Sequence, residues 1–368
     1  MSSKTRRPLA IFVSVALGLA TLAPLVHADP QPQSQREERA RRRAAGKQAE
    51  QAKPALYPNA TRKSPETNAS PKAIKHLQEL SAMFDKEQWA ELIVKAEEVA
   101  AMEKANAYDK SFAYMMAGSA AANMDDQAKA EHYFQMAVDT NGLDNDSHYS
   151  AMYNLVAVRY GEEKYAEALA MLDRFLLETK TEKPDQLSLR AGILAAMNRF
   201  DEAAVEYKKL LAKNPGDKRL LMNTVSVLQN GEKDDEANVL LEDAYKRGML
   251  TEKRELRALY VGYMNAQRWD DARKVIDDGV AKGILQKDAD LARDYQILAQ
   301  NAYMDDKIPL AIELYKLAAP LAADGEAYLN LAKVLEYADR KAEAKAAAKQ
   351  ALEKGVKKPE EANRIISR

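Results

Sequence analysis

The sequence predicts an all-α fold built from about eight consecutive helix–turn–helix units. Glycine and proline are scarce, with 14 and 13 of the 368 residues, and eight of the prolines lie in the first 71 residues. The rest of the chain therefore holds only five prolines, as a body made of long helices requires. A pattern of large and small apolar residues also recurs at intervals of 33 to 39 residues between Leu92 and Ala344. Such a period indicates a repeat array of helix pairs.

The first 28 residues have the three-part layout of a secretory signal peptide. A short basic start is followed by an apolar run from Leu9 to Val26 and by a Val-His-Ala cleavage-like site. We expect cleavage between Ala28 and Asp29, which would release a periplasmic chain. The alternative is an uncleaved anchor, because the run is near the lower length limit for spanning a bilayer.

Residues 29–70 are predicted to form a disordered, basic and proline-rich tail. They carry nine Lys or Arg against five Asp or Glu and few large apolar side chains. Residues 1–28 carry three positive charges and no negative ones, so the chain without them has a net charge of −4 rather than −1. The tail contributes +4, which leaves an acidic body. The tail is interpreted either as a flexible spacer or as a basic arm, Arg36 to Arg43, that holds the protein near anionic lipid or an acidic partner.

The body, residues 71–355, contains a recurring pattern with a small or apolar residue at its centre. Its clearest copies begin with a large side chain three residues before the centre, as in Tyr165-x-x-Ala168, Phe200-x-x-Ala203 and Trp269-x-x-Ala272. The eight centres are Leu92, Ala130, Ala168, Ala203, Ala237, Ala272, Ala311 and Ala344. Apolar residues four and seven positions later share a face of a helix with the centre, so the small residue marks where two helices approach closely. Residues 356–368 are left as a C-terminal extension.

This pattern resembles the 34-residue tetratricopeptide repeat, in which each unit is a pair of antiparallel helices. A second small position precedes the centre by twelve residues, at Gly118, Ala191, Ala299 and Ala332. The resemblance implies a right-handed superhelix with a concave face.

A further resemblance covers residues 218–286. Gly248 to Glu252, with Glu255-Leu256 and Leu259-Tyr260, is similar to a segment of exported repeat proteins that accompany TonB/ExbB/ExbD-type energy-transducing complexes. Lys282-Gly283-Ile284-Leu285 continues this similarity. It implies an accessory subunit that works beside the proton-driven motor and the TonB-like protein.

The sequence contains no catalytic signature. There is no cysteine, no phosphate-binding glycine loop, no nucleophile elbow and no zinc-protease motif. His76, His132 and His148 are too scattered for a metal site, and His148 is expected in an exposed loop. The acidic pairs beginning at Asp125, Asp234, Asp270 and Asp305 are interpreted as helix-capping residues. We therefore expect neither an enzyme nor a bound metal or cofactor, and no nucleic acid partner.

The first helices of the units are expected to line a groove for a protein segment. Their register predicts ten groove residues: Met115, Tyr153, Tyr160, Met222, Gln229, Arg257, Met264, Gln296, Gln300 and Tyr303, with Ser119 beside them. Tyrosine, methionine and arginine are common in protein interfaces. The list depends on the helical register, and a shift of one residue would change most of it.

Three hypotheses about function follow. The first is an exported scaffold that binds protein segments within a TonB-linked transport system. The second is a scaffold for cell-envelope or outer-membrane assembly unrelated to TonB. The third, an enzyme such as a lytic transglycosylase, would need a catalytic domain for which the residues after the array leave no room.

Overall fold

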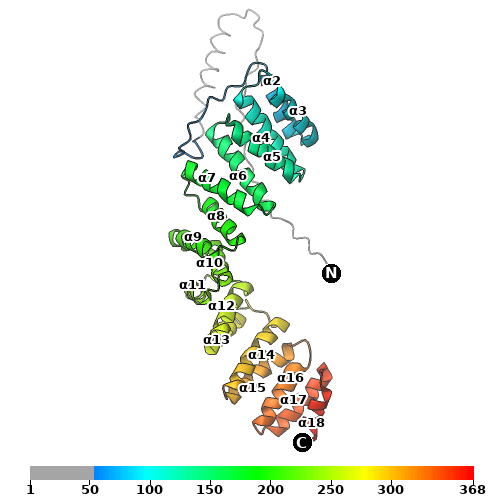
Figure 1. The fold of residues 1–368 in the computed structure, drawn as a ribbon. Helices are drawn as coiled ribbons and strands as arrows, with labels where there is room; N and C mark the ends of the chain where they lie inside the picture. Colours follow the sequence, from blue (N-terminus) through cyan, green and yellow to red (C-terminus); the bar gives the residue numbers. More distant parts are fainter. Residues whose placement is uncertain (1–53) are drawn as a thin grey trace, which may run out of the picture. The chain divides into compact units, whose positions relative to one another are not determined.

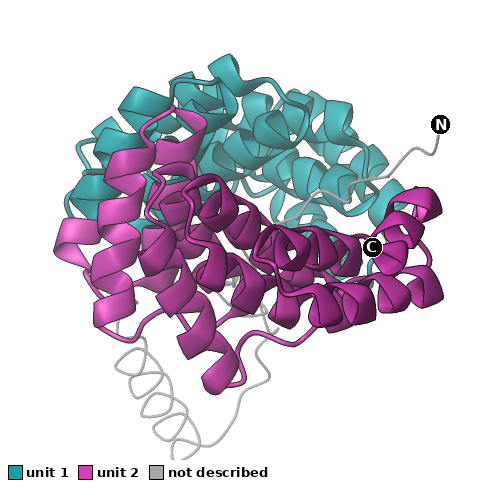
Figure 2. Ribbon diagram, turned by 90° about the horizontal axis from the view of Figure 1, so that it is seen from below, with its two compact units in different colours: residues 1–210 teal, residues 211–368 magenta. Residues whose placement is uncertain are grey.

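The computed structural model describes residues 54–368, and this part of the chain consists of seventeen helices and no strand (Figure 1). The predicted signal peptide, its cleavage site at Ala28 and Asp29, and the basic arm lie outside the described residues. Among residues 54–368, no helix combines the length and the apolar character needed to cross a bilayer. The helices fall into two compact units, which meet within one helix after Leu210 (Figure 2).

Unit 1 contains the first three helix pairs, the first helix of the fourth pair and most of its second helix. Its helices are α2 (Ile74–Asp85), α3 (Trp89–Ala101), α4 (Ala107–Asn123), α5 (Gln127–Thr140), α6 (Asn145–Gly161), α7 (Tyr165–Thr179), α8 (Pro184–Ala196) and α9 (Phe200–Lys213), the last of which runs into unit 2. Each helix from α3 to α7 packs against the next one along the chain.

Unit 2 contains the remaining four pairs and one further helix. These are α10 (Lys218–Asn230), α11 (Asp234–Lys246), α12 (Lys253–Asn265), α13 (Trp269–Ala281), α14 (Ala289–Met304), α15 (Ile308–Leu321), α16 (Glu326–Tyr337), α17 (Lys341–Lys354) and α18 (Pro359–Ser367). Helix α18 packs on α16 and α17, so the segment after the array extends the helical stack.

The eight predicted repeat centres all occupy the same structural position. Each is the fourth residue of the second helix of a pair, and each is fully buried. Close approach explains the small side chains. A Cβ added at Gly118 on α4, for example, would lie 2.7 Å from a ring carbon of Phe134 on α5. The prediction of eight consecutive helix pairs is therefore confirmed.

The turn between the two helices of a pair has the same backbone conformation in all eight pairs. Each of the eight turns contains one non-glycine residue in the left-handed region, with φ between 55° and 60°, as at Glu163 (58°) and Asp339 (55°). The following residue then donates a backbone hydrogen bond into the end of the first helix, as Lys164 N does to Arg159 O at 2.8 Å. This left-handed ending satisfies carbonyl groups that the helix terminus leaves free.

Residues 54–70 do not form a disordered tail. They are extended chain that lies against unit 1 and bonds to residues from α4 to α8, as in the bond from Thr61 N to Glu178 O at 2.8 Å. Two side chains, Tyr57 and Arg62, make most of the contacts. A segment with few apolar residues is thus held by specific anchors, which composition alone does not reveal.

Candidate protein-interaction surface

Each first helix of the pairs has a narrow stripe of side chains at its surface. From α6 to α16 a row of exposed or half-buried positions on each first helix is spaced by four, three and four residues, which is the period of one helix face. We call these residues the first-helix stripe. They are Ser150, Asn154, Ala157 and Gly161 on α6; Asp185, Leu189, Gly192 and Ala196 on α8; Arg219, Asn223, Ser226 and Asn230 on α10; Arg254, Ala258, Val261 and Asn265 on α12; Arg293, Ile297, Gln300 and Met304 on α14; and Glu326, Asn330, Lys333 and Tyr337 on α16.

Most of the predicted groove residues lie one position away from this stripe. Of the ten, only Gln300 belongs to it, together with the neighbouring Ser119 at the equivalent place on α4. Met115 and Met264 are buried and pack in the core, so the prediction that they line a groove is wrong. The first helices are covered on several sides by neighbouring helices, so a shift of one residue can move a position from the surface into the core.

The remaining predicted groove residues differ in exposure. Tyr153, Met222 and Gln296 are half-buried, whereas Tyr160, Gln229 and Tyr303 are exposed at the end of their helices. The ring of Tyr153 packs against Phe175 and that of Tyr160 against Tyr165, with centroids 5.5 Å apart in both pairs. These two tyrosines therefore contribute to packing within unit 1 as well as to its surface.

Arg257 has a structural role that sequence reasoning missed. Its Nη2 lies 3.1 Å from Oδ1 of Asp294 on α14, and Tyr260 donates to Oδ2 of the same carboxylate at 2.7 Å. Asp294 is buried, so the guanidinium compensates a charge that would be costly alone. The hydrogen bond and the charge of Asp294 raise the pKa of Arg257, and burial raises that of Tyr260.

The signature around Gly248 is also structural. Gly248 ends α11 with a φ of 71°, and the backbone N–H groups of Thr251 and Glu252 donate to Oε2 of Glu255 at 2.8 and 3.0 Å. Burial opposes ionisation of Glu255, but Lys218 at 2.8 Å and these N–H groups hold its pKa below the usual value. The motif therefore shapes the junction between α11 and α12.

The most apolar part of the first-helix stripe lies on α14 and α16. Ile297 and Met304 are exposed on α14, and Tyr337 is exposed at the end of α16. Tyr303, which neighbours Met304, packs edge-on against Tyr337 with centroids 5.6 Å apart. Together with Gln300 these residues form what we call the α14–α16 patch. Exposed aromatic, methionine and isoleucine side chains around one amide are typical of a contact surface for another protein.

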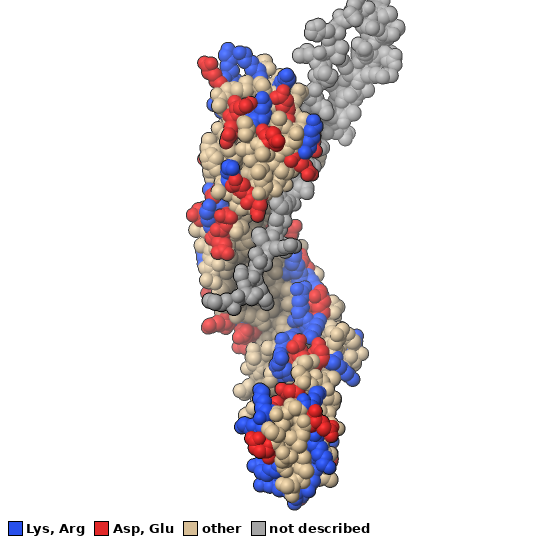
Figure 3. All heavy atoms as spheres, turned by 90° about the vertical axis from the view of Figure 1, so that its right-hand side faces the viewer, with Lys and Arg blue, Asp and Glu red and all other residues tan. Residues whose placement is uncertain are grey.

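The charged side chains do not mark a site for a highly charged ligand. On the face shown in Figure 3, basic and acidic residues are interspersed over the described surface. Many are paired across helices, as Arg159 is with Glu131 at 2.9 Å and Lys253 with Asp288 at 2.7 Å. Within residues 54–368, no group of three or more acidic, histidine or cysteine residues could hold a metal ion.

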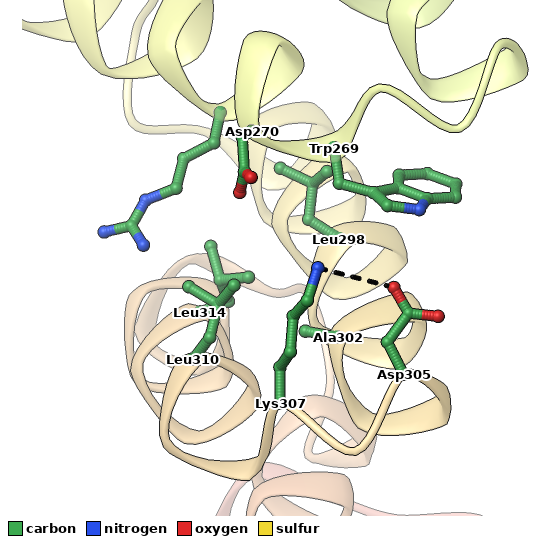
Figure 4. Close-up of a pocket in the computed structure, with 9 residues that line it drawn as sticks. Trp269, Asp270, Leu298, Ala302, Asp305, Lys307, Leu310 and Leu314 are labelled. Atoms are coloured by element: carbon green, nitrogen blue, oxygen red, sulfur yellow. Dashed lines mark ion pairs between the residues drawn. The ribbon is translucent and has the colours of Figure 1, made fainter.

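A small cavity lies between three helices of unit 2. It lies between α13, α14 and α15, where Trp269, Leu298, Ala302 and Leu314 surround a volume of about 10 Å³, and Lys307 pairs with Asp305 at 3.6 Å beside it (Figure 4). That volume holds no more than one water molecule.

The acidic pairs and His148 have local structural environments. Asp126 caps α5 by accepting from Lys129 N at 3.1 Å. Asp234 is the first residue of α11, and Asp270 lies in the first turn of α13. His148 lies in the first turn of α6 and is fully buried, so the expectation of an exposed loop is wrong. Burial lowers the pKa of His148 to about 4, and the charges of Arg62 and Arg174 contribute to this shift.

Comparison with known proteins supports the fold. No protein-family model matches the chain, and no curated protein matches its sequence. Among solved structures, a tetratricopeptide repeat protein from Parabacteroides merdae is similar, with 16% identity, a TM-score of 0.42, and coverage of 70% of this chain and 97% of that chain. YrrB, described as a TPR protein with an unusual peptide-binding site, has 18% identity, a TM-score of 0.40, and coverage of 51% and 91%.

A third similar structure is that of Naa15/Naa10 bound to HypK, which has 11% identity and a TM-score of 0.52. The match covers 76% of this chain but only 42% of that chain. The eight helix pairs with their repeated buried centres show that the chain has an all-α tetratricopeptide-repeat fold, and the match with a TM-score of 0.52 supports this arrangement.

Proposed function

We propose that the chain is a non-catalytic scaffold that binds protein segments on its first-helix stripe. The observation that carries this proposal is the α14–α16 patch, where Ile297, Met304 and Tyr337 remain exposed beside Gln300. When a partner covers these isoleucine, methionine and tyrosine side chains, apolar surface is removed from water, which stabilises the complex. The polar and small residues along the rest of the stripe allow a partner's backbone to approach closely.

We further propose that the scaffold is exported and works as an accessory subunit of a TonB/ExbB/ExbD-type system. The layout of residues 1–28 supports export, and the similarity of residues 218–286 to exported TonB-associated repeat proteins supports the partner class. Membrane association would then occur through that partner or through the basic residues of the tail.

Purification of the full chain from detergent-solubilised membranes tests this proposal. We expect a motor subunit or a TonB-like protein to copurify with the wild type and to be lost with Ile297→Asp/Met304→Asp. Val239→Asp is the matched control, because Val239 is also an exposed apolar residue but lies on a second helix, α11. If the wild type retrieves only envelope-assembly proteins, the TonB assignment fails and the scaffold for cell-envelope assembly is the better account.

A further inference from the structure

An extended segment of the chain lies along one edge of unit 1. We call residues 54–70 the strap; it appears as the dark blue trace that leads into α2 in Figure 1. Its bonds reach three successive junctions between helix pairs: Asn106 before α4, Asn141 to Asn145 before α6, and Gln186 in α8. The strap thus follows the row of turns that join the pairs.

Tyr57 of the strap occupies an aromatic socket. Its ring stands edge-on to Tyr149 and to Phe175, with centroids 5.4 and 5.5 Å apart. Gln186 donates to its hydroxyl at 2.9 Å, and Lys183 Nζ lies 4.9 Å from the ring centroid. Burial raises the pKa of Tyr57. The socket thus binds both the apolar ring and the polar end of a tyrosine.

Arg62 is held by a set of neutral acceptors. Its guanidinium donates to Asn141 Oδ1 at 2.9 Å, to Asn145 Oδ1 at 2.6 Å and to Leu143 O at 2.9 Å. Asn145 in turn donates to the carbonyl of Arg62 at 2.9 Å. Only the planar, five-donor group of arginine fits several acceptors arranged in this way.

The edge beneath the strap also contains buried polar atoms that are not used. Among the described residues, His148 is one whose two buried ring nitrogens both lack a hydrogen-bond partner. In a protein core, nearly all buried polar groups form hydrogen bonds. The strap resembles instead a peptide ligand, with two anchor side chains on a chain that otherwise has little apolar surface.

We propose that this edge of unit 1 is a peptide-binding site, and that residues 54–66 are its intramolecular ligand. The site recognises an extended segment in which a tyrosine precedes an arginine by five residues, as Tyr57 precedes Arg62. The covalent link gives the strap a high effective concentration, so a partner segment with the same pattern binds only when it displaces the strap. This site is independent of the α14–α16 patch and of the proposed TonB partner.

Binding of a fluorescent synthetic peptide that spans residues 54–66 tests the proposal on the full chain. In Tyr57→Ala/Arg62→Ala the strap loses both anchors, so we expect the variant to bind the peptide at least tenfold more tightly than the wild type does. A peptide with the same two substitutions should bind at least tenfold more weakly. Lys63→Ala is the matched control, since Lys63 is exposed on the same segment, and it should behave like the wild type.

A second measurement keeps the test valid if the double variant does not fold. A site-specific protease sequence inserted after Ser64 allows the strap to be cut in an otherwise wild-type, folded chain. The cut strap should then exchange with the fluorescent peptide while the helical circular dichroism is retained. Failure of a folded double variant or of the cut chain to take up the peptide would overturn the proposal, as would equal binding of the substituted peptide.

Discussion

Arg257 on α12 and Asp294 on α14 form an ion pair, with 3.1 Å between Nη2 and Oδ1, that joins two successive helix pairs of unit 2. The carboxylate of Asp294 is buried, whereas the side chain of Arg257 is partly exposed. The sequence pattern placed the same arginine among the predicted groove residues. Its geometry instead indicates a role in stability, because few other groups neutralise Asp294.

Replacement of Arg257 by alanine should therefore destabilise the folded chain. We expect the free energy of unfolding to fall by about 1–3 kcal/mol, less than for a fully buried pair because Arg257 is partly exposed. Urea unfolding followed by circular dichroism measures this change. Arg254→Ala is the control, since Arg254 is largely exposed in its pair with Glu252 and should change stability by less than about 0.5 kcal/mol. Equal effects of both substitutions would mean that Asp294 does not depend on Arg257.

Two glycines should respond in opposite directions to alanine. In Gly118→Ala the new Cβ would lie 2.7 Å from the ring of Phe134, and overpacking should cost about 1–3 kcal/mol. Gly161, the last residue of α6, has no atom within 4 Å of the same position. Gly161→Ala should therefore stabilise the chain by about 0.5–1 kcal/mol, because alanine loses less backbone entropy in a helix. Thermal melting of the two variants distinguishes these outcomes, and a stabilising Gly118→Ala would contradict the close approach of α4 and α5.

Stability should decrease below neutral pH through His148. Its pKa is about 4 in the folded chain and 6.5 when unfolded, so the unfolded chain binds more protons between these values. The contribution of His148 to stability is complete above pH 6.5 and is lost as the pH falls towards 4, by roughly 3 kcal/mol in total. Arg62 of the strap and Arg174 of α7 oppose protonation, whereas Asp144 favours it.

Unfolding in urea at a series of pH values from 7 to 4 tests this expectation. His148→Phe should flatten the dependence, and the same substitution at the exposed His132 should not. If both variants retain the full loss of stability between pH 6.5 and 4, carboxylates elsewhere in the chain are responsible.

Sequence reasoning predicted the repeat far better than the surface. The eight centres could be identified because seven of them carry the small side chain, alanine, that a close helix crossing requires, and Ala203 and Ala272 are equally buried. The exposed stripe could not be identified in the same way. Gln296 and Ile297 are adjacent on α14, and only the packing of the surrounding helices decides that Gln296 is half-buried and Ile297 is exposed.

The strap was missed for a different reason. Tyr57 and Arg62 are two anchors in a segment whose composition otherwise indicates disorder, and their sockets are formed by residues 79 to 129 positions later in the chain. A contact of this kind depends on the folded array, so no local pattern in residues 54–70 indicates it. The prediction that His148 lies in an exposed loop was wrong for the same reason, because His148 lies at the edge of unit 1 beneath the strap.

Photo-crosslinking from Gln300 in living cells tests the central claim, that the first-helix stripe is the surface that binds protein partners. A photoreactive residue at Gln300 lies within the α14–α16 patch, and the same residue at Val239 lies on an exposed face of α11. The account predicts a discrete crosslinked protein from Gln300 and none from Val239. Crosslinks of equal yield and mass from both positions, or none from Gln300 under conditions in which the partner copurifies, would contradict it.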